Sequence, residues 1–349
     1  MTAALLAKFR PVGPWRSGPD SGDADRVDAV YHSDSVFSAV TTAMASLGIL
    51  DEWLAATARN EAGASVRFTS CYPFQGPTLY LVPPRTLWPP EPSTRVRWKG
   101  ARFVPSTVVD SLLAGEPMED EKWAVDGPSA CLVRPGQIGP FREGLRGGAA
   151  VDRLHEGVLP HLTACIEFGE GAGLWSAIVF ADEEQRQRWS APVRDALRLL
   201  GDTGLGGKRS RGWGRFETPI FSEGSLESLL LPRMSVPETP AEAATAPEAA
   251  PATGPRSLWL LSLYVPSAAD AVSWDRGNYS IVTRSGRVES PAGWGSLKKD
   301  LKMVAEGSVL VASGELAGAA PDVAPDGFAH PVFRSGAPVA LSVHLQGAT

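Results

Sequence analysis

The chain has 349 residues, which at about 150 residues per domain favours two domains. Its 33 Lys and Arg residues against 39 Asp and Glu residues give a formal net charge of −6, and 43% of its residues are hydrophobic. This composition is typical of a folded protein and excludes one that coats nucleic acid by bulk positive charge. Any binding to a polyanion must therefore come from a local group of cations.

Cysteines and histidines give no sign of a disulfide framework or a metal centre. Cys71, Cys131 and Cys165 are scattered and form no CxxC pair, which favours small buried side chains in a reducing compartment. The five histidines lie too far apart in the sequence for a local zinc motif, so neither a metal nor a cofactor is expected.

Targeting signals are also lacking in the sequence pattern. Near the start, Lys8 and Arg10 follow the short apolar run, which is the reverse of the order in a signal peptide. No window approaches 18 apolar residues, so we expect a cytoplasmic protein with no membrane segment.

The first half of the chain alternates predicted strands and helices. We expect strands at 4–10, 65–70, 79–82, 162–168, 174–180 and 212–219, and helices at 34–47 and 191–200 with Ser33 and Ser190 as N-caps. Residues 83–150, rich in Pro, Gly and Trp, are interpreted as long insertions. The order of elements is that of a ferredoxin-like (RRM-like) βαββαβ unit.

A stretch rich in Ala and Pro, residues 236–255, separates the two halves and predicts a flexible or semi-extended linker. The expected division is 1–232, a linker at 233–256, and 257–349. In the last part we expect strands at 257–265, 280–283, 308–312 and 339–345 and a helix at 297–305. The prediction is an α+β protein with two ferredoxin-like domains, the second degenerate.

The segment Gly201–Phe216, GDTGLGGKRSRGWGRF, holds six glycines among basic and hydroxyl side chains. Glycines allow positive φ and close approach of a polyanion to backbone N–H groups, while cations neutralise phosphates. The predicted ligands here are Gly204, Gly206, Gly207, Lys208, Arg209, Ser210 and Arg211, with Trp213 as a face for base stacking.

Other interpretations of this segment fit less well. A P-loop would need a glycine where Asp202 stands and a Ser or Thr where Arg209 stands, and a Rossmann motif lacks its third glycine at Arg209. Both motifs also require a strand before the loop and a helix after it, whereas here the helix comes first. The alternative to a nucleic-acid-binding loop is a surface turn whose charges are solvated and bind no ligand.

Five places in the sequence together resemble the RAMP superfamily of CRISPR-associated proteins, and most closely the fourth subunit of the type III-A effector complex. They are the glycine-rich segment with the helix end before it, YHSDSVFSA at 31–39, RGGAAVDR at 146–153, EGSV at 306–309 and HPVFRSG at 330–336. The departures are Trp213 and the 236–255 stretch, which resembles an insertion.

The resemblance implies a non-catalytic crRNA-binding subunit built from two ferredoxin-like folds. In that family the subunit holds the 5′ repeat-derived tag of the crRNA and joins the large polymerase-like (cyclase-like) subunit to the backbone RAMP subunit of the filament, in antiviral defence. The resemblance also adds four residues to the expected RNA-binding set: Arg146 and Arg153 on a hairpin, and His32 and Ser33. Ser33 and Asp34 are also expected as helix caps, and Arg334 and His330 as packing residues.

One enzymatic alternative stays open, because some RAMP relatives cleave repeat RNA without a metal. Such cleavage needs a general base and acid near the 2′-hydroxyl, and His32 with Tyr31 is the only local pair of suitable residues. Most of the 11 tryptophans are expected in the core or at interfaces, with Trp213 as the exception.

Overall fold

The computed structural model describes residues 3–18, 23–90, 98–151, 157–233, 254–290 and 293–343. Nearly all of the predicted linker at 236–255, and Arg153 of the predicted hairpin, lie outside these described residues. Within the described part of the chain, no helix has both the length and the apolar character needed to cross a membrane.

The main sheet is antiparallel, and the last strand of the first half of the chain pairs with its first strand. Its order is β11 (Ile220–Ser225), β1 (Ala3–Phe9), β10 (Ala172–Phe180), β3 (Tyr72–Gln75), β4 (Thr78–Leu81) and β5 (Val104–Pro105), with β2 (Val66–Phe68) also paired to β10. All nine residues of β10 are buried, as expected for a central strand covered on both faces.

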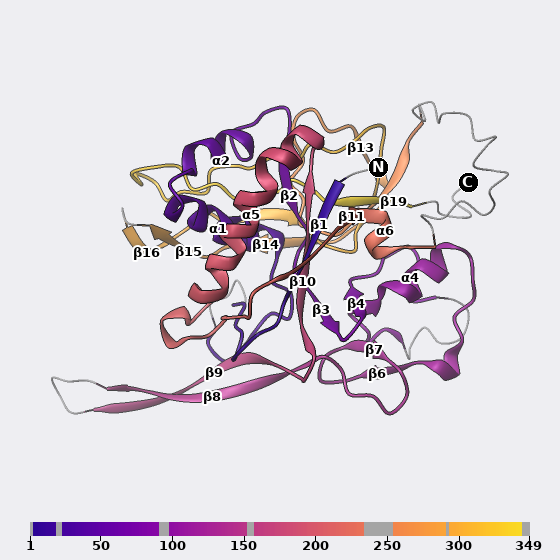
Figure 1. Ribbon diagram of the computed structural model, residues 1–349, viewed down its shortest axis with the longest axis horizontal. Helices are drawn as coiled ribbons and strands as arrows, with labels where there is room; N and C mark the ends of the chain where they lie inside the picture. The colour runs from indigo at the N-terminus through magenta and orange to yellow at the C-terminus, as the bar shows by residue number, and fades with distance from the viewer. Residues whose placement is uncertain are drawn as a thin grey trace.

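Two long helices connect these strands and lie side by side, α1 (Ser33–Ser46) and α5 (Glu183–Thr203) (Figure 1). The predicted start of the second helix at residue 191 is wrong. The Asp182 side chain accepts a 2.8 Å hydrogen bond from the Gln185 N–H and caps a helix that continues through Pro192. The shorter helices are α2 (Leu50–Ala56), α4 (Ser106–Leu113) and α6 (Leu226–Leu230).

The predicted insertions at 83–150 contain α4, the short pair β6 (Ala124–Asp126) and β7 (Cys131–Val133), and the first strand of a long hairpin. That hairpin, β8 (Phe141–Val151) and β9 (Val158–Phe168), projects well away from the body (Figure 1, lower left). The hydrophobic pattern predicted only the C-terminal part of β9, because the small residues of β8 give no alternation, whereas the family resemblance implied a hairpin at Arg146.

The second half forms a four-stranded antiparallel sheet of order β13 (Val272–Asn278), β18 (Val309–Ala312), β12 (Arg256–Leu260) and β19 (Ala340–Val343). Two further pairs are β14 (Ile281–Arg284) with β17 (Leu301–Val304), and β15 (Arg287–Ser290) with β16 (Gly293–Leu297). The predicted helix at 297–305 is wrong, because these residues pair with neighbouring strands and tertiary pairing overrides their helical spacing.

The two halves share one buried cluster. Trp259, Leu261 and Leu341 of the second half belong to the same cluster of buried residues as Trp53 and Trp175 of the first. Cys71, Cys131 and Cys165 are free and buried, as the sequence predicted. The mixed α and β prediction is confirmed, and the shared core fixes the surfaces that meet between the halves.

Candidate nucleic-acid interface

The glycine-rich segment forms a tight loop between α5 and the main sheet. The predicted strand at 212–219 is wrong, because Gly212 and Gly214 have φ of 79° and 75°, a left-handed conformation that a strand does not use. The chain instead makes a single 3-10 turn at Arg209–Arg211 and reaches β11 only at Ile220.

The loop packs against its own backbone, and this packing accounts for two of its glycines. A Cβ on Gly206 would lie 2.2 Å from the Arg16 carbonyl oxygen, and a Cβ on Gly214 would lie 1.9 Å from the Leu205 carbonyl oxygen. Both residues also have positive φ, so only glycine fits either place without strain.

The expectation that the glycine N–H groups contact RNA needs correction. The Gly204 N–H donates to the Leu200 carbonyl at 2.8 Å, and the Gly207 N–H donates to the Arg16 carbonyl at 2.8 Å. The glycines therefore shape the loop, and the side chains are what it offers to a ligand.

Three of the predicted side-chain ligands project into solvent, namely Lys208, Ser210 and Arg211. Arg209 differs, since its guanidinium forms an ion pair with Glu289 of β15 in the second half. Trp213 is half-buried beside the loop. Of the cations predicted to bind phosphate, the loop therefore presents Lys208 and Arg211 to solvent.

The hairpin meets the loop at Arg211. A Cβ on Gly148 of β8 would lie 2.8 Å from the His161 ring and 3.3 Å from an Arg211 nitrogen, so both side chains lie over this glycine. Arg146, two residues along β8, forms a 2.5 Å ion pair with Glu167 across the hairpin and is exposed. Lys208, Arg211 and Arg146 thus belong to neighbouring parts of one surface.

Sequence reasoning missed Arg16, which anchors the loop to the hairpin. Its buried guanidinium donates to the carbonyl of Ala164 on β9 at 2.7 Å and to the Asp23 carbonyl at 2.7 Å, while its own carbonyl receives the Gly207 N–H. Nothing in the local sequence distinguishes this arginine from an exposed one, because all of its partners come from tertiary packing.

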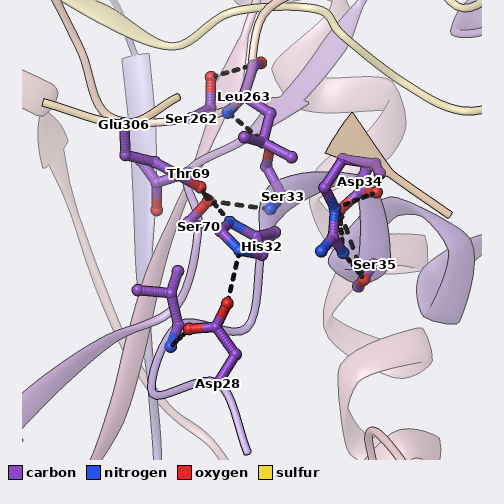
Figure 2. A network of polar contacts seen from close by, with 12 residues as sticks. Asp28, His32, Ser33, Asp34, Ser35, Thr69, Ser70, Ser262, Leu263 and Glu306 are labelled. Atoms are coloured by element: carbon purple, nitrogen blue, oxygen red, sulfur yellow. Dashed lines mark hydrogen bonds and ion pairs between the residues drawn. The ribbon is translucent and has the colours of Figure 1, made fainter. Parts of the chain in front are cut away.

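The structure also gives His32 and Ser33 another role than the predicted RNA contact. Both are buried; the His32 ring bonds to Glu306 at 2.7 Å and to Asp28 at 3.1 Å. The Ser33 hydroxyl does not cap α1, since it accepts a 3.0 Å hydrogen bond from the Leu263 N–H (Figure 2). These buried residues join the first half to the second and are not exposed to a ligand in solvent.

A buried ion cluster beside them makes the same connection. Asp34 of α1 receives two hydrogen bonds from Arg284, of 3.1 and 3.2 Å, and is also paired with Arg334. Burial would raise the pKa of Asp34, but the two guanidinium groups and His32 hold it well below its usual range. Arg334 is thereby confirmed as a packing residue, and Asp34 is a buried ion-pair partner.

His32 links stability to pH. Burial alone would lower its pKa and Arg284 opposes its charge, but the carboxylates of Glu306 and Asp28 raise it to about 9. Because the folded pKa exceeds the ordinary value of 6.5, the contribution of protonated His32 is complete below pH 6.5 and is lost as the pH rises through about 9.

We therefore expect the wild-type chain to lose roughly 3 kcal/mol more unfolding free energy between pH 6 and pH 9.5 than His32→Gln does, at about 1.4 kcal/mol per pKa unit. Urea denaturation of both proteins at the two pH values measures this. Parallel losses in the two proteins would show that His32 is neutral when folded.

The proposed pair for RNA cleavage does not face solvent. His32 is 4% exposed and Tyr31 7%, and burial raises the pKa of the Tyr31 hydroxyl far above its usual value. The RNA-cleaving alternative thus loses its only local candidates. Among the described residues, no group of three or more His, Cys, Asp or Glu side chains is placed to hold a metal ion.

The site therefore combines a glycine-rich loop at the end of a helix with a hairpin that lies beside it. Residues 255–343 match the family model of the CRISPR Csm4 C-terminal domain. No curated protein matches the chain.

Solved structures agree over the full length. A chain of the Csm1–Csm4 cassette in complex with cA4 has 19% identity and a TM-score of 0.56, with 98% of each chain covered. A chain of the Csm3–Csm4 subcomplex in the type III-A CRISPR-Cas interference complex has 15% identity and a TM-score of 0.60, with 99% of this chain and 100% of that chain covered. The family model thus covers the C-terminal part of the chain, and over its full length the chain shares the fold of chains in these two complexes.

Proposed function

We propose that the protein is a non-catalytic, crRNA-binding subunit of a type III-A CRISPR effector complex in the cytoplasm. It holds the 5′ repeat-derived tag of the crRNA and joins a Csm1-type large subunit to a Csm3-type backbone subunit. The observation that supports this most directly is the exposed pair Lys208 and Arg211, beside Arg146 of the hairpin, in a chain of net charge −6.

The partners follow from the similar structures, which contain Csm1 with Csm4 and Csm3 with Csm4. We further propose that the strand orders β11-β1-β10-β3 and β13-β18-β12-β19 are two ferredoxin-like arrangements, the second with strands in place of helices. The proposed division remains 1–232, a linker at 233–256, and 257–349.

Replacing Lys208 and Arg211 together with alanine should weaken binding to single-stranded repeat RNA while the fold stays intact, because both side chains are exposed. The logarithm of the binding constant falls linearly with the logarithm of the salt concentration, and each lost phosphate contact makes this slope shallower by about 0.7. The slope of the double variant should therefore be shallower by about 1.4. Fluorescence anisotropy at several salt concentrations measures the slope.

The matched control is Lys122→Ala with Arg188→Ala, which removes the same charge from exposed positions outside the loop and the hairpin. It should leave the slope nearly unchanged. Equal slopes for the loop variant and the wild-type protein would refute phosphate binding by the loop. Intact RNA after incubation, and co-purification with Csm1-type and Csm3-type subunits, are the expected results for the remaining parts of the proposal.

A further inference from the structure

A cavity of about 510 Å³ lies behind the glycine-rich loop, between the two halves of the chain. Its walls come from α1 (residues 34–42), from the loop itself (204–207), and from β15 and the segment 330–334 of the second half. Its volume lies in the range typical of sites for small organic ligands, roughly 300–1,000 Å³.

The cavity is positively charged although the chain is acidic. Its lining includes five cationic side chains, Arg209, Arg284, Arg287, Lys298 and Arg334, and two carboxylates, Asp34 and Glu289. Five minus two leaves three uncompensated positive charges, against −6 for the whole chain. Low-dielectric walls strengthen the attraction of such a site for an anion.

Two of its donors lack a partner. The Arg334 Nε is buried and makes no hydrogen bond, although the other guanidinium nitrogens bind Asp34 and the Ser285 carbonyl. Within the described part of the chain, the Lys298 ammonium also has no hydrogen-bond or ion-pair partner. The half-buried Lys298 side chain lines the cavity, where burial and the nearby Arg334 lower its pKa and Asp34 and Glu289 oppose that shift. Buried donors left unpaired are costly, and an anion would satisfy them.

The lining also includes apolar side chains, among them Leu54, Val332 and Phe333. A ligand that suits the whole cavity therefore combines an anionic group with a flat apolar part. We propose, resting on the function proposed above, that this cavity binds one nucleotide unit, with its phosphate at the Lys298 ammonium. Such a unit has two possible sources: a free nucleotide, or one nucleotide of the RNA held by the loop.

The test uses the full-length protein with AMP, adenosine and single-stranded repeat RNA as probes, and compares Lys298→Ala with Lys302→Ala. Both variants remove one lysine, but Lys302 is exposed on β17 and does not line the cavity. Lys298→Ala should fold, because burial and the nearby Arg334 already disfavour the charge that it removes. Calorimetry gives AMP affinity, and anisotropy gives RNA affinity with and without AMP.

We expect AMP to bind and adenosine not to bind, with AMP at least about tenfold weaker in Lys298→Ala and unchanged in Lys302→Ala, as for loss of a charged hydrogen bond. If AMP weakens RNA binding by competition, the cavity holds a nucleotide of the RNA. If the RNA affinity is the same with and without AMP, the ligand is a free nucleotide.

Equal AMP affinity in wild-type protein and Lys298→Ala would overturn the proposal. So would absence of AMP binding at millimolar concentration together with unchanged RNA affinity in Lys298→Ala. These results leave RNA binding by Lys208 and Arg211 intact. Conversely, AMP binding in a protein that does not bind RNA would refute the proposed function and support the cavity.

Discussion

Asp34→Ala should destabilise the protein by about 3–5 kcal/mol, a large share of the stability of an ordinary domain. The substitution leaves Arg284 and Arg334, both less than 8% exposed in their side chains, without their common carboxylate. Removing one partner of a buried ion pair strands the other charge in a low-dielectric environment, which costs far more than loss of an exposed pair.

Urea denaturation of Asp34→Ala and Asp34→Asn measures this effect and separates charge from volume, since asparagine keeps the shape of the side chain. Asp51→Ala is the control, because Asp51 is 90% exposed and its pair with Arg59 is long at 3.4 Å. We expect the control to be nearly neutral. If Asp34→Ala were as mild as Asp51→Ala, the arginines would have found water or other acceptors, and the cluster would not hold the halves together.

The sequence predicted the first half better than the second for a physical reason. The ends of α1 and the central strand β10 follow from hydrophobic periodicity, which local residues determine. Residues 297–305 have apolar side chains at helical spacing too, yet they form parts of β16 and β17, because β14 and β15 supply backbone partners that no local pattern reveals.

The residues of the candidate site also differ in how far local sequence could predict their role. Lys208 and Arg211 were predicted as exposed cations of a glycine-rich loop, and the structure places them there. His32 and Ser33 were recognised as important positions, but their partners Glu306 and Leu263 are more than 200 residues away in sequence, so their role was assigned to RNA instead. A buried histidine between two carboxylates can be recognised only when both halves are in place.

Lys298 illustrates what sequence reasoning could not supply. It lies in the run KKD at 298–300, where three charged residues in succession suggest a solvated turn. The structure separates the two lysines: Lys299 pairs with Asp326 at 2.8 Å in solvent, while Lys298 faces the cavity beside Arg334. Burial, and not residue type, distinguishes the two lysines.

The glycines of the loop provide a second test with a large effect. Gly214→Ala should destabilise the protein by at least about 1–3 kcal/mol, because φ is 75° and the new methyl carbon would lie 1.9 Å from the Leu205 carbonyl oxygen. Backbone must move to relieve this contact, so RNA binding should be lost with the shape of the loop even though Lys208 and Arg211 remain.

Gly207→Ala is the matched variant in the same loop. Its φ is not in the left-handed region, the nearest atom to a new Cβ is the Arg16 Cδ at 3.5 Å, and its N–H already donates to the Arg16 carbonyl. We therefore expect a melting temperature and an RNA affinity close to those of the wild-type protein. Thermal denaturation and anisotropy on the two variants decide between two roles for the glycines. If Gly207→Ala kept its melting temperature but lost RNA binding, the RNA backbone would approach Gly207 itself, and the glycines would be contact residues as well as shape-determining ones.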